Sequence, residues 1–213
     1  MPGRTGSKRG RARAYHHGDL KEALIEAALK ILRSEGLEAL TLRAVAREVG
    51  VTQAAPYRHF ADRRALVAAV AERGFVWLQE AMLEGIRSAQ GRAGLRQVAV
   101  AYVRFGLDNP AVYRVMFGPE VANTADLPSL RQTARPVLGF VAEGIRQLQN
   151  AGLVGEGDPH LMAVATWSAL HGLVMLTLDG QTSSVATDVN VLVAEATRIM
   201  MFGMAARAGD LPK

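Results

Sequence analysis

The stretch from Thr41 to Phe60, TLRAVAREVGVTQAAPYRHF, decides the fold of this chain. Its first half carries apolar residues at the spacing of one helix face: Leu42, Val45, Ala46 and Val49. Thr41 can cap that helix, Gly50 can take the positive φ that follows a helix end, and Thr52 can cap a second helix. Because Pro56 has no amide to donate, we expect the second helix to be short and close to 3₁₀. Two such helices predict a helix-turn-helix, which lays its second helix in the major groove of DNA.

Charge supports this prediction. The first 74 residues carry 14 Lys and Arg against 8 Asp and Glu, whereas the rest of the chain carries 11 against 12. The basic excess therefore lies with the motif and predicts a polyanionic partner for it. Residues 1–14 form a Gly-rich basic arm that contains Arg4, Lys8, Arg9, Arg11 and Arg13. Such an arm can contact phosphates or a minor groove, or it can be a solubilising tail.

The segment 15–75 resembles the N-terminal domain of the TetR family of transcriptional regulators. Three blocks carry the resemblance, GLEALTLRAVA at 36–46, GVT at 50–52 and YRHFADRRAL at 57–66. Further on, WSALHG at 167–172 is similar to the Trp-His-Gly element of one subgroup of that family. The resemblance implies a helix-turn-helix domain followed by a helical domain that binds a ligand and forms a dimer.

The fold class expected from the periodicity is all-α, with about nine helices and no strand. A flexible arm at 1–14 precedes a three-helix DNA-binding domain at 15–61 and a larger ligand-binding and dimerisation domain at 62–213. Besides the two helices of the motif, we expect helices at 19–35, 62–90, 95–108, 111–117, 128–151, 159–179 and 187–207, with a loop at 118–127. Asp19 with Glu22 predicts a capping box, and Asp158 followed by Pro159 predicts a helix start.

Composition excludes several classes of protein. The chain has no cysteine, so disulfides and thiolate sites are impossible, and a cytoplasmic location is expected. Residues 161–178 and 189–206 are apolar, but both contain polar residues in mid-span, so buried helices are favoured over membrane spans. No nucleophile–base pair, phosphate loop or metal-ligand spacing favours an enzyme, a metal or a cofactor.

Roles in DNA binding follow from the motif and from the resemblance. Gln53 can contact adenine through two hydrogen bonds, and Thr52 or Ala54 can touch a thymine methyl group. The resemblance implies phosphate contacts by Thr41, Arg43, Tyr57, His59 and Arg63 or Arg64. His59 can instead be a packed structural histidine beside Phe60. The predicted DNA-binding set is Thr41, Leu42, Arg43, Thr52, Gln53, Ala54, Tyr57, Arg58, His59, Arg63 and Arg64.

Two apolar segments near 159–179 and 187–207 predict a homodimer. Paired helix-turn-helix domains read the two half-sites of a palindromic operator, which a single domain binds weakly. Apolar residues at helical spacing offer a surface for a two-fold contact: Ala163, Trp167, Leu170, Val174, Leu192, Ala196, Ile199 and Met200. The same faces can also be internal core.

Aromatic and methionine side chains in the later part of the chain predict a pocket for a small-molecule effector. The candidates are Tyr102, Phe105, Tyr113, Met116, Phe117, Phe140, Met162, Trp167, His171 and Met175. His171 or Arg104 could orient a polar ligand. Side chains of these types are also typical of an ordinary core, so both interpretations stay open. By resemblance, a bound ligand would shift the helix at 62–90 and lower the affinity for DNA.

The sequence therefore predicts a DNA-binding transcriptional regulator, a homodimeric repressor that a small molecule releases from its operator. Two alternatives remain at this point. One is an activator or a regulator that needs no ligand, and the other is a helical protein-interaction module without DNA.

Overall fold

The computed structural model describes residues 17–87, 89, 91–123, 125–184 and 188–203. Over these residues the chain forms nine α-helices, one 3₁₀ helix and no strand, which confirms the all-α prediction. They are α1 (His17–Glu35), α2 (Leu42–Val49), η1 (Pro56–Arg58), α3 (Arg63–Arg87), α4 (Gly91–Asp108), α5 (Pro110–Met116), α6 (Pro119–Ala122), α7 (Pro128–Asn150), α8 (Pro159–Leu178) and α9 (Val189–Gly203). The basic arm predicted at 1–14 lies outside the described residues, as do the last residues of the helix expected at 187–207.

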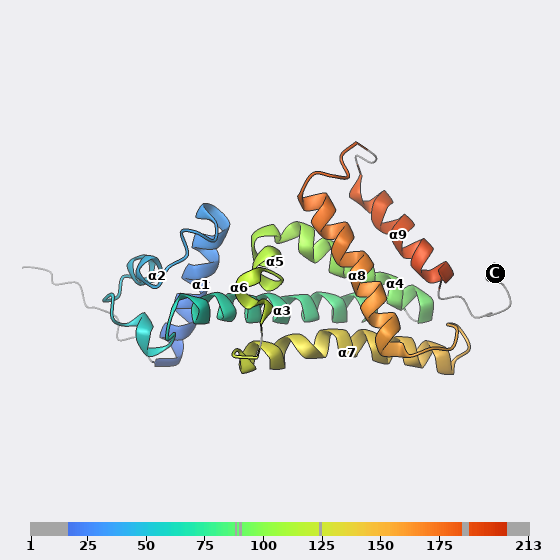
Figure 1. Cartoon of the computed structure of the whole chain (residues 1–213), viewed down its shortest axis with the longest axis horizontal. Coiled ribbons are helices and arrows are strands. Elements are labelled where there is room, and N and C mark those ends of the chain that lie inside the picture. The colour runs from blue at the N-terminus through green and yellow to red at the C-terminus, as the bar shows by residue number, and fades with distance from the viewer. Residues whose placement is uncertain (1–16, 88, 90, 124, 185–187, 204–213) are drawn as a thin grey trace, which may run out of the picture.

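The long helix α3 runs along the long axis of the molecule (Figure 1). At one end of it lie α1, α2 and η1, and toward the other end α8 crosses over the helices beneath it, with α9 beside it. Along its length α3 packs against α4, α5, α6 and α7. Because α3 is continuous, it connects the helix-turn-helix directly to the helical C-terminal part.

The caps of α2 form as predicted. The Thr41 hydroxyl accepts a hydrogen bond from the Ala44 amide at 3.1 Å, and Gly50 ends the helix with φ of 77°. The prediction that Thr52 caps the second helix is wrong. That helix, η1, begins only at Pro56, and Thr52 uses its backbone carbonyl to accept from the Ala55 amide in a turn. The short 3₁₀ form expected from Pro56 is confirmed.

Two other helix starts differ from expectation. Helix α1 begins at His17, so Asp19 lies inside it and the predicted capping box is wrong. Residues 119–122, expected to be loop, form the short helix α6. At α3 and α8 the caps agree with prediction, since Asp62 accepts from the Ala65 amide and Asp158 from the His160 amide, both at 2.8 Å.

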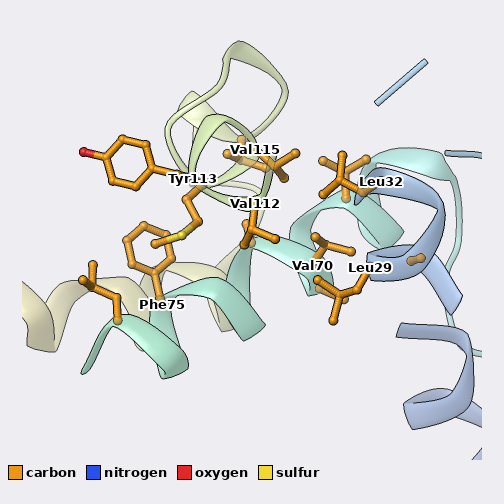
Figure 2. Close-up of a cluster of buried hydrophobic side chains, with 14 of the residues drawn as sticks. Leu29, Leu32, Val70, Phe75, Val112, Tyr113 and Val115 are labelled. Atoms are coloured by element: carbon orange, nitrogen blue, oxygen red, sulfur yellow. The ribbon is translucent and has the colours of Figure 1, made fainter. Parts of the chain in front are cut away.

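One buried apolar cluster runs through both expected domains. Helix α5 lies at the junction, with Val112 and Val115 toward Leu32 and Val70 and with Tyr113 on its opposite side (Figure 2). The domain boundary expected after residue 61 is therefore crossed by a continuous core, and movement of one part is felt by the other.

Gly74 permits the close approach of α3 and α5. A Cβ atom at this position would lie 2.5 Å from Met116 Sδ and 2.8 Å from Val112 Cγ1. Atoms in proteins do not approach so closely without displacement, so a side chain here would push the two helices apart.

Candidate nucleic-acid interface and internal cavity

The helix-turn-helix presents a polar, basic face. Pro56 and Phe60 are buried and fix both ends of η1 in the core, which leaves the residues around them outside. Tyr57 is 54% exposed although it is aromatic. The predicted contact residues that are exposed are Thr41, Arg43, Thr52, Gln53, Ala54, Tyr57 and Arg58. They lie on α2, on η1 and on the turn between them, so the motif brings most of the predicted DNA-binding set onto one short stretch.

The positive charge of this face is uncompensated. Within the described residues, Arg43, Arg47 and Arg58 form no ion pair, whereas the nearby carboxylate of Glu48 is paired with Lys30. Arg47 stands one turn after Arg43 on the exposed side of α2, and the sequence analysis missed it. The i, i+4 spacing from Arg43 was the available signal. Unpaired arginines around exposed polar groups suit a polyanion.

Leu42, also in the predicted set, has its side chain in the core at 5% exposure. It helps to bind α2 to the rest of the domain. Only its backbone amide, in the first turn of α2, is left to meet a phosphate.

His59 packs as the structural histidine that the sequence analysis allowed, while its phosphate contact stays a prediction. Its ring is half-buried beside Phe60, and within the described residues its Nε2 atom is buried with no hydrogen-bond partner. A buried N–H without an acceptor is costly, so the neutral ring carries its proton on Nδ1. The ring can therefore pack through one edge and donate from the other.

Arg63 is engaged inside the protein. Its Nη1 atom donates to both carboxylate oxygens of Glu120, at 2.8 and 2.9 Å. Its Nε and Nη2 atoms donate to the carbonyls of Leu40 at 2.8 Å and Leu37 at 2.7 Å. The guanidinium thus joins the turn between α1 and α2 to α6, and we call this arrangement the Arg63 clasp. The phosphate contact predicted for Arg63 stays a prediction, and the structure gives the residue a second role.

Arg64 is held by the same segment. Its Nε atom donates to the Glu120 carbonyl at 3.0 Å and its Nη2 atom to the Asn123 carbonyl at 2.8 Å. Both arginines therefore bind α6, and Arg64 also binds the residue after it. Since α6 was expected to be loop, the sequence offered no partner for either guanidinium.

An internal cavity of about 520 Å³ lies among the C-terminal helices. Such a volume is typical of small-molecule pockets. Its wall is mostly apolar and draws on α3 to α9: Phe75, Leu78, Met82, Val98, Tyr102, Met116, Phe117, Val121, Ala122, Leu130, Ala134, Leu138, Trp167, Leu170 and Met200 are among the residues that line it. Because Val121 and Ala122 belong to α6, the cavity wall and the Arg63 clasp share one short helix.

Four of the ten predicted pocket residues line this cavity: Tyr102, Met116, Phe117 and Trp167. The other six are not among its lining residues: Phe105, Tyr113, Phe140, Met162, His171 and Met175. Arg104, the other polar candidate, does not line it either, and its guanidinium donates to the Asn190 side chain at 2.9 Å. The sequence analysis missed the share of α7, because small aliphatic residues such as Ala134 give no aromatic signal.

A chain of hydrogen bonds runs from the cavity wall into the core. Trp167 Nε1 donates to the Tyr102 hydroxyl at 2.9 Å, that hydroxyl meets the Tyr113 hydroxyl at 2.7 Å, and the latter meets His171 Nδ1 at 2.7 Å. The indole can only donate, so satisfying every hydroxyl makes Tyr102 donate to Tyr113 and Tyr113 donate to His171. His171 is then neutral, with its proton on Nε2.

Burial explains the acid–base character of this chain. It raises the pKa of Tyr102 to about 12 and raises the pKa of Tyr113 further, while it lowers the pKa of His171. All three groups are thus kept in their neutral forms, which is the state that the hydrogen bonds require.

Helix α8 is apolar on nearly all sides, yet much of it is uncovered. It is long and apolar enough to cross a membrane by length and composition, with 22% of its most apolar stretch buried. Of the two interpretations left open for the apolar stripe of this helix, core holds for Ala163, Leu170 and Val174, which are buried within the chain itself. An adjacent stripe is accessible instead, formed by Leu161, Ala165, Ser168, Gly172 and Leu176.

Comparison with known proteins places both parts of the chain. Residues 24–70 match the family model described as bacterial regulatory proteins, TetR family, and residues 95–200 match the model described as tetracyclin repressor-like, C-terminal domain. A protein of unknown function from Rhodococcus sp. RHA1 is similar in structure, with a TM-score of 0.79 and 30% identity, covering 91% of this chain and 100% of that one. A bacterial regulatory protein in the TetR family from Rhodococcus RHA1 has the same fold, with a TM-score of 0.64 and 20% identity over 88% of this chain and 97% of its own.

A curated relative matches over a shorter stretch. The uncharacterized HTH-type transcriptional regulator YobS of Bacillus subtilis (strain 168) is 28% identical over 96 residues. The match spans 45% of this chain and half the length of that protein.

Proposed function

The chain belongs to the TetR family of transcriptional regulators, and on that premise we propose that it is a homodimeric repressor which leaves a palindromic operator when a small molecule fills its cavity. It is a DNA-binding regulator and not an enzyme. The finer proposal depends on one observation, which is that α6 both lines the cavity through Val121 and holds Arg63 through Glu120. We place this regulator in the cytoplasm, where its operator would be.

The exposed face of the helix-turn-helix supplies the DNA contacts in this proposal. Thr41, Arg43, Tyr57 and His59 bind phosphates, and the exposed turn residues Thr52, Gln53 and Ala54 meet base edges. Phosphate contacts position the protein without reading the sequence, whereas contacts to base edges select it. Arg47 joins the phosphate-binding set because it is exposed and unpaired beside Arg43.

The uncovered stripe of α8, with the exposed residues Val191 and Ile199 of α9, supplies the dimer contact. Leu161 is 69% exposed in the single chain, and Leu176, Val191 and Ile199 on these two helices are each more than half exposed. Large apolar patches on a soluble domain usually mark an interaction surface. A two-fold pairing of these helices would cover the patch on both copies at once.

The Arg63 clasp carries the signal from the cavity to the DNA-binding end. A molecule that fills the cavity presses on Val121 and Ala122, and so moves Glu120, which lies beside them on α6. Arg63 follows Glu120, and the carbonyls of Leu37 and Leu40 follow Arg63. The two helix-turn-helix motifs of a dimer would then lose the spacing that the operator requires, and the equilibrium would shift from operator-bound to free protein.

Selection of DNA from a random pool by the purified full chain tests the proposal. Symmetric half-sites about one helical turn apart are expected, with an affinity that falls steeply as salt rises. Asymmetric single sites, or an affinity indifferent to salt, would contradict it. Transcription in vitro from a promoter carrying the selected site then separates repression from activation, and loss of repression on adding cell-derived small molecules tests release by a ligand.

A further inference from the structure

Three arginines that donate to no oxygen acceptor in the described residues line the cavity. From Arg63 onward, the described arginines that donate a hydrogen bond to a carboxylate, carbonyl or amide oxygen are Arg63, Arg64, Arg73, Arg87, Arg92, Arg104, Arg114, Arg146 and Arg198. Arg96, Arg131 and Arg135 make no such bond within the part of the chain that the structure describes, and all three line the cavity. No aspartate or glutamate is among the described lining residues.

The position of these arginines is unfavourable for the empty protein. Arg131 and Arg135 stand one turn apart on α7, where like charges repel, and Arg96 belongs to α4, which packs against α7. All three side chains are exposed, so they lie where the cavity opens to solvent. An apolar cavity wall beside grouped charges of one sign strengthens the field at its opening and attracts the opposite charge.

The interior of the cavity offers almost nothing to a polar group. The Trp167 indole donates to the Tyr102 hydroxyl, and that hydroxyl is also hydrogen-bonded to Tyr113. The hydroxyls of Thr166 and Thr197 donate to carbonyls of their own helices, at 2.8 Å in each case. A polar group placed inside would lose its hydration without gaining a partner, so the interior favours an apolar body.

We propose that the cavity binds an amphiphilic organic anion, with its apolar body inside and its carboxylate at Arg131 and Arg135, one turn apart on α7. Guanidinium groups suit this head because they form paired, charge-assisted hydrogen bonds to a carboxylate. The proposal rests on the proposed function only in taking this cavity as the effector site. Binding of the anion is measured without DNA, so an experiment can contradict this inference without contradicting the proposed function, and the reverse.

Calorimetric titration of the full chain with three molecules that share one tail tests the inference. Decanoate, decanol and decyltrimethylammonium, each below its micelle-forming concentration, share a ten-carbon chain and carry a negative, a neutral and a positive head. We expect decanoate to bind at least about tenfold more tightly than decanol, as grouped charge-assisted contacts imply, and decyltrimethylammonium to bind weakest.

Variants identify where the head lies. Arg131→Gln with Arg135→Gln should bring the affinity for decanoate down to that for decanol while leaving decanol within about twofold, since the apolar wall is unchanged. Arg131→Glu with Arg135→Glu should reverse the preference, so that decyltrimethylammonium binds best; a misfolded chain could not produce this result. Arg146→Gln, on the same helix α7 but paired with Glu143 and not among the lining residues, serves as the control and should change none of the three affinities.

Three outcomes would overturn the inference: no binding of decanoate, equal binding of decanoate and decanol, or a preference unaffected by both double variants. If the protein selects symmetric DNA sites but does not bind decanoate, the proposed function stands and the anion site is contradicted. If the protein binds decanoate through these arginines but its affinity for DNA does not change with decanoate, the anion site stands and release from DNA by the ligand is contradicted.

Discussion

Arg63 and Glu120 lie 57 positions apart in the chain and link the DNA-binding end to α6, which lines the cavity. One nitrogen of Arg63 meets both carboxylate oxygens, while the other two nitrogens hold carbonyls at the end of the turn after α1. Both side chains are about one-third exposed, so the pair contributes little to the free energy of unfolding. Its main effect is to fix the orientation of α6 relative to the turn. A bidentate geometry restricts how α6 and the turn can move relative to each other.

Replacing Glu120 by Gln should loosen this link. One charge-assisted contact becomes a weaker neutral one, so the free energy of unfolding should fall by no more than about 1 kcal/mol. The clearer effect is expected in hydrogen exchange, where the amides of residues 36–41 should exchange faster because Arg63 no longer holds the turn firmly. Glu143→Gln, which breaks an exposed pair within α7, should leave exchange at 36–41 unchanged. Equal exchange in both variants would show that the clasp does not order the turn.

Two substitutions of His59 separate its two nitrogens. Asparagine places an amide N–H close to the position of Nδ1, whereas glutamine places it near Nε2, which is buried without a partner in the described structure. His59→Asn should keep DNA affinity within about threefold, and His59→Gln should lose roughly tenfold, because one hydrogen bond to a charged phosphate is missing. Fluorescence anisotropy on a selected site and on an unrelated duplex measures both. Tighter DNA binding by the glutamine variant than by the asparagine variant would mean that Nε2, and not Nδ1, donates to the phosphate.

Gly74→Ala and Gly144→Ala should have opposite effects on stability. At Gly74 a Cβ atom collides with Val112 and Met116, so the free energy of unfolding should fall by about 1–3 kcal/mol. At Gly144, inside α7, a Cβ atom meets nothing within 4 Å, and stability should rise by about 0.5–1 kcal/mol through better helix propensity. Urea unfolding monitored by circular dichroism gives both values, and a shared sign would contradict the packing described for α3 and α5.

Leu176→Glu tests the face of α8 that is proposed for the dimer. Leu176 is 52% exposed in the single chain, and a carboxylate there would be buried without a partner if a second copy covered it. Light scattering after gel filtration should give twice 22.9 kDa for the unaltered chain and 22.9 kDa for the variant. Leu83→Glu, at a comparably exposed leucine on α3, should remain dimeric. Dissociation by the control instead would move the interface away from α8.

The local features were predictable because their causes are local. Thr41 and Gly50 act within one or two turns of their own helix, so the sequence states both the cap and the stop. Pro56 limits η1 for the same reason, since the missing amide is its own. The exposed face of the motif could therefore be predicted from the sequence, whereas the burial of Leu42 depends on how α2 packs against the rest of the domain.

The Arg63 clasp and the arginines of the cavity could not be predicted, because the residues that give them their roles are distant in sequence. Arg63 depends on Glu120, and Glu120 lies in a four-residue helix that is too short to show any periodicity. Arg131 and Arg135 matter only because α7 packs beside α3, α4 and α8. On α8 the difficulty is different. A helix that is apolar on nearly every side gives no signal for which side is buried, so the sequence could not decide between core and dimer surface for its apolar stripe.

The pH dependence of stability should contain a contribution from His171. Burial lowers the pKa of His171 in the folded protein below its ordinary value of 6.5, and Nδ1 already accepts the hydrogen bond of Tyr113. As the pH falls through 6.5, His171 binds a proton in the unfolded chain but not yet in the folded protein, so the free energy of unfolding decreases. The contribution is complete above 6.5 and is lost progressively below it.

His171→Gln keeps an acceptor near Tyr113 and removes the titration. Urea unfolding of both proteins at several values between pH 8 and pH 5, at one protein concentration because dimer formation adds to stability, isolates the difference. The variant should be the less stable protein at pH 8, and the gap should narrow as the pH falls. Every other group is the same in both proteins, so the difference between the two pH profiles reports on position 171. A gap that stays constant or widens toward pH 5 would mean that His171 is not held neutral by the core, and that Tyr113 does not donate to it.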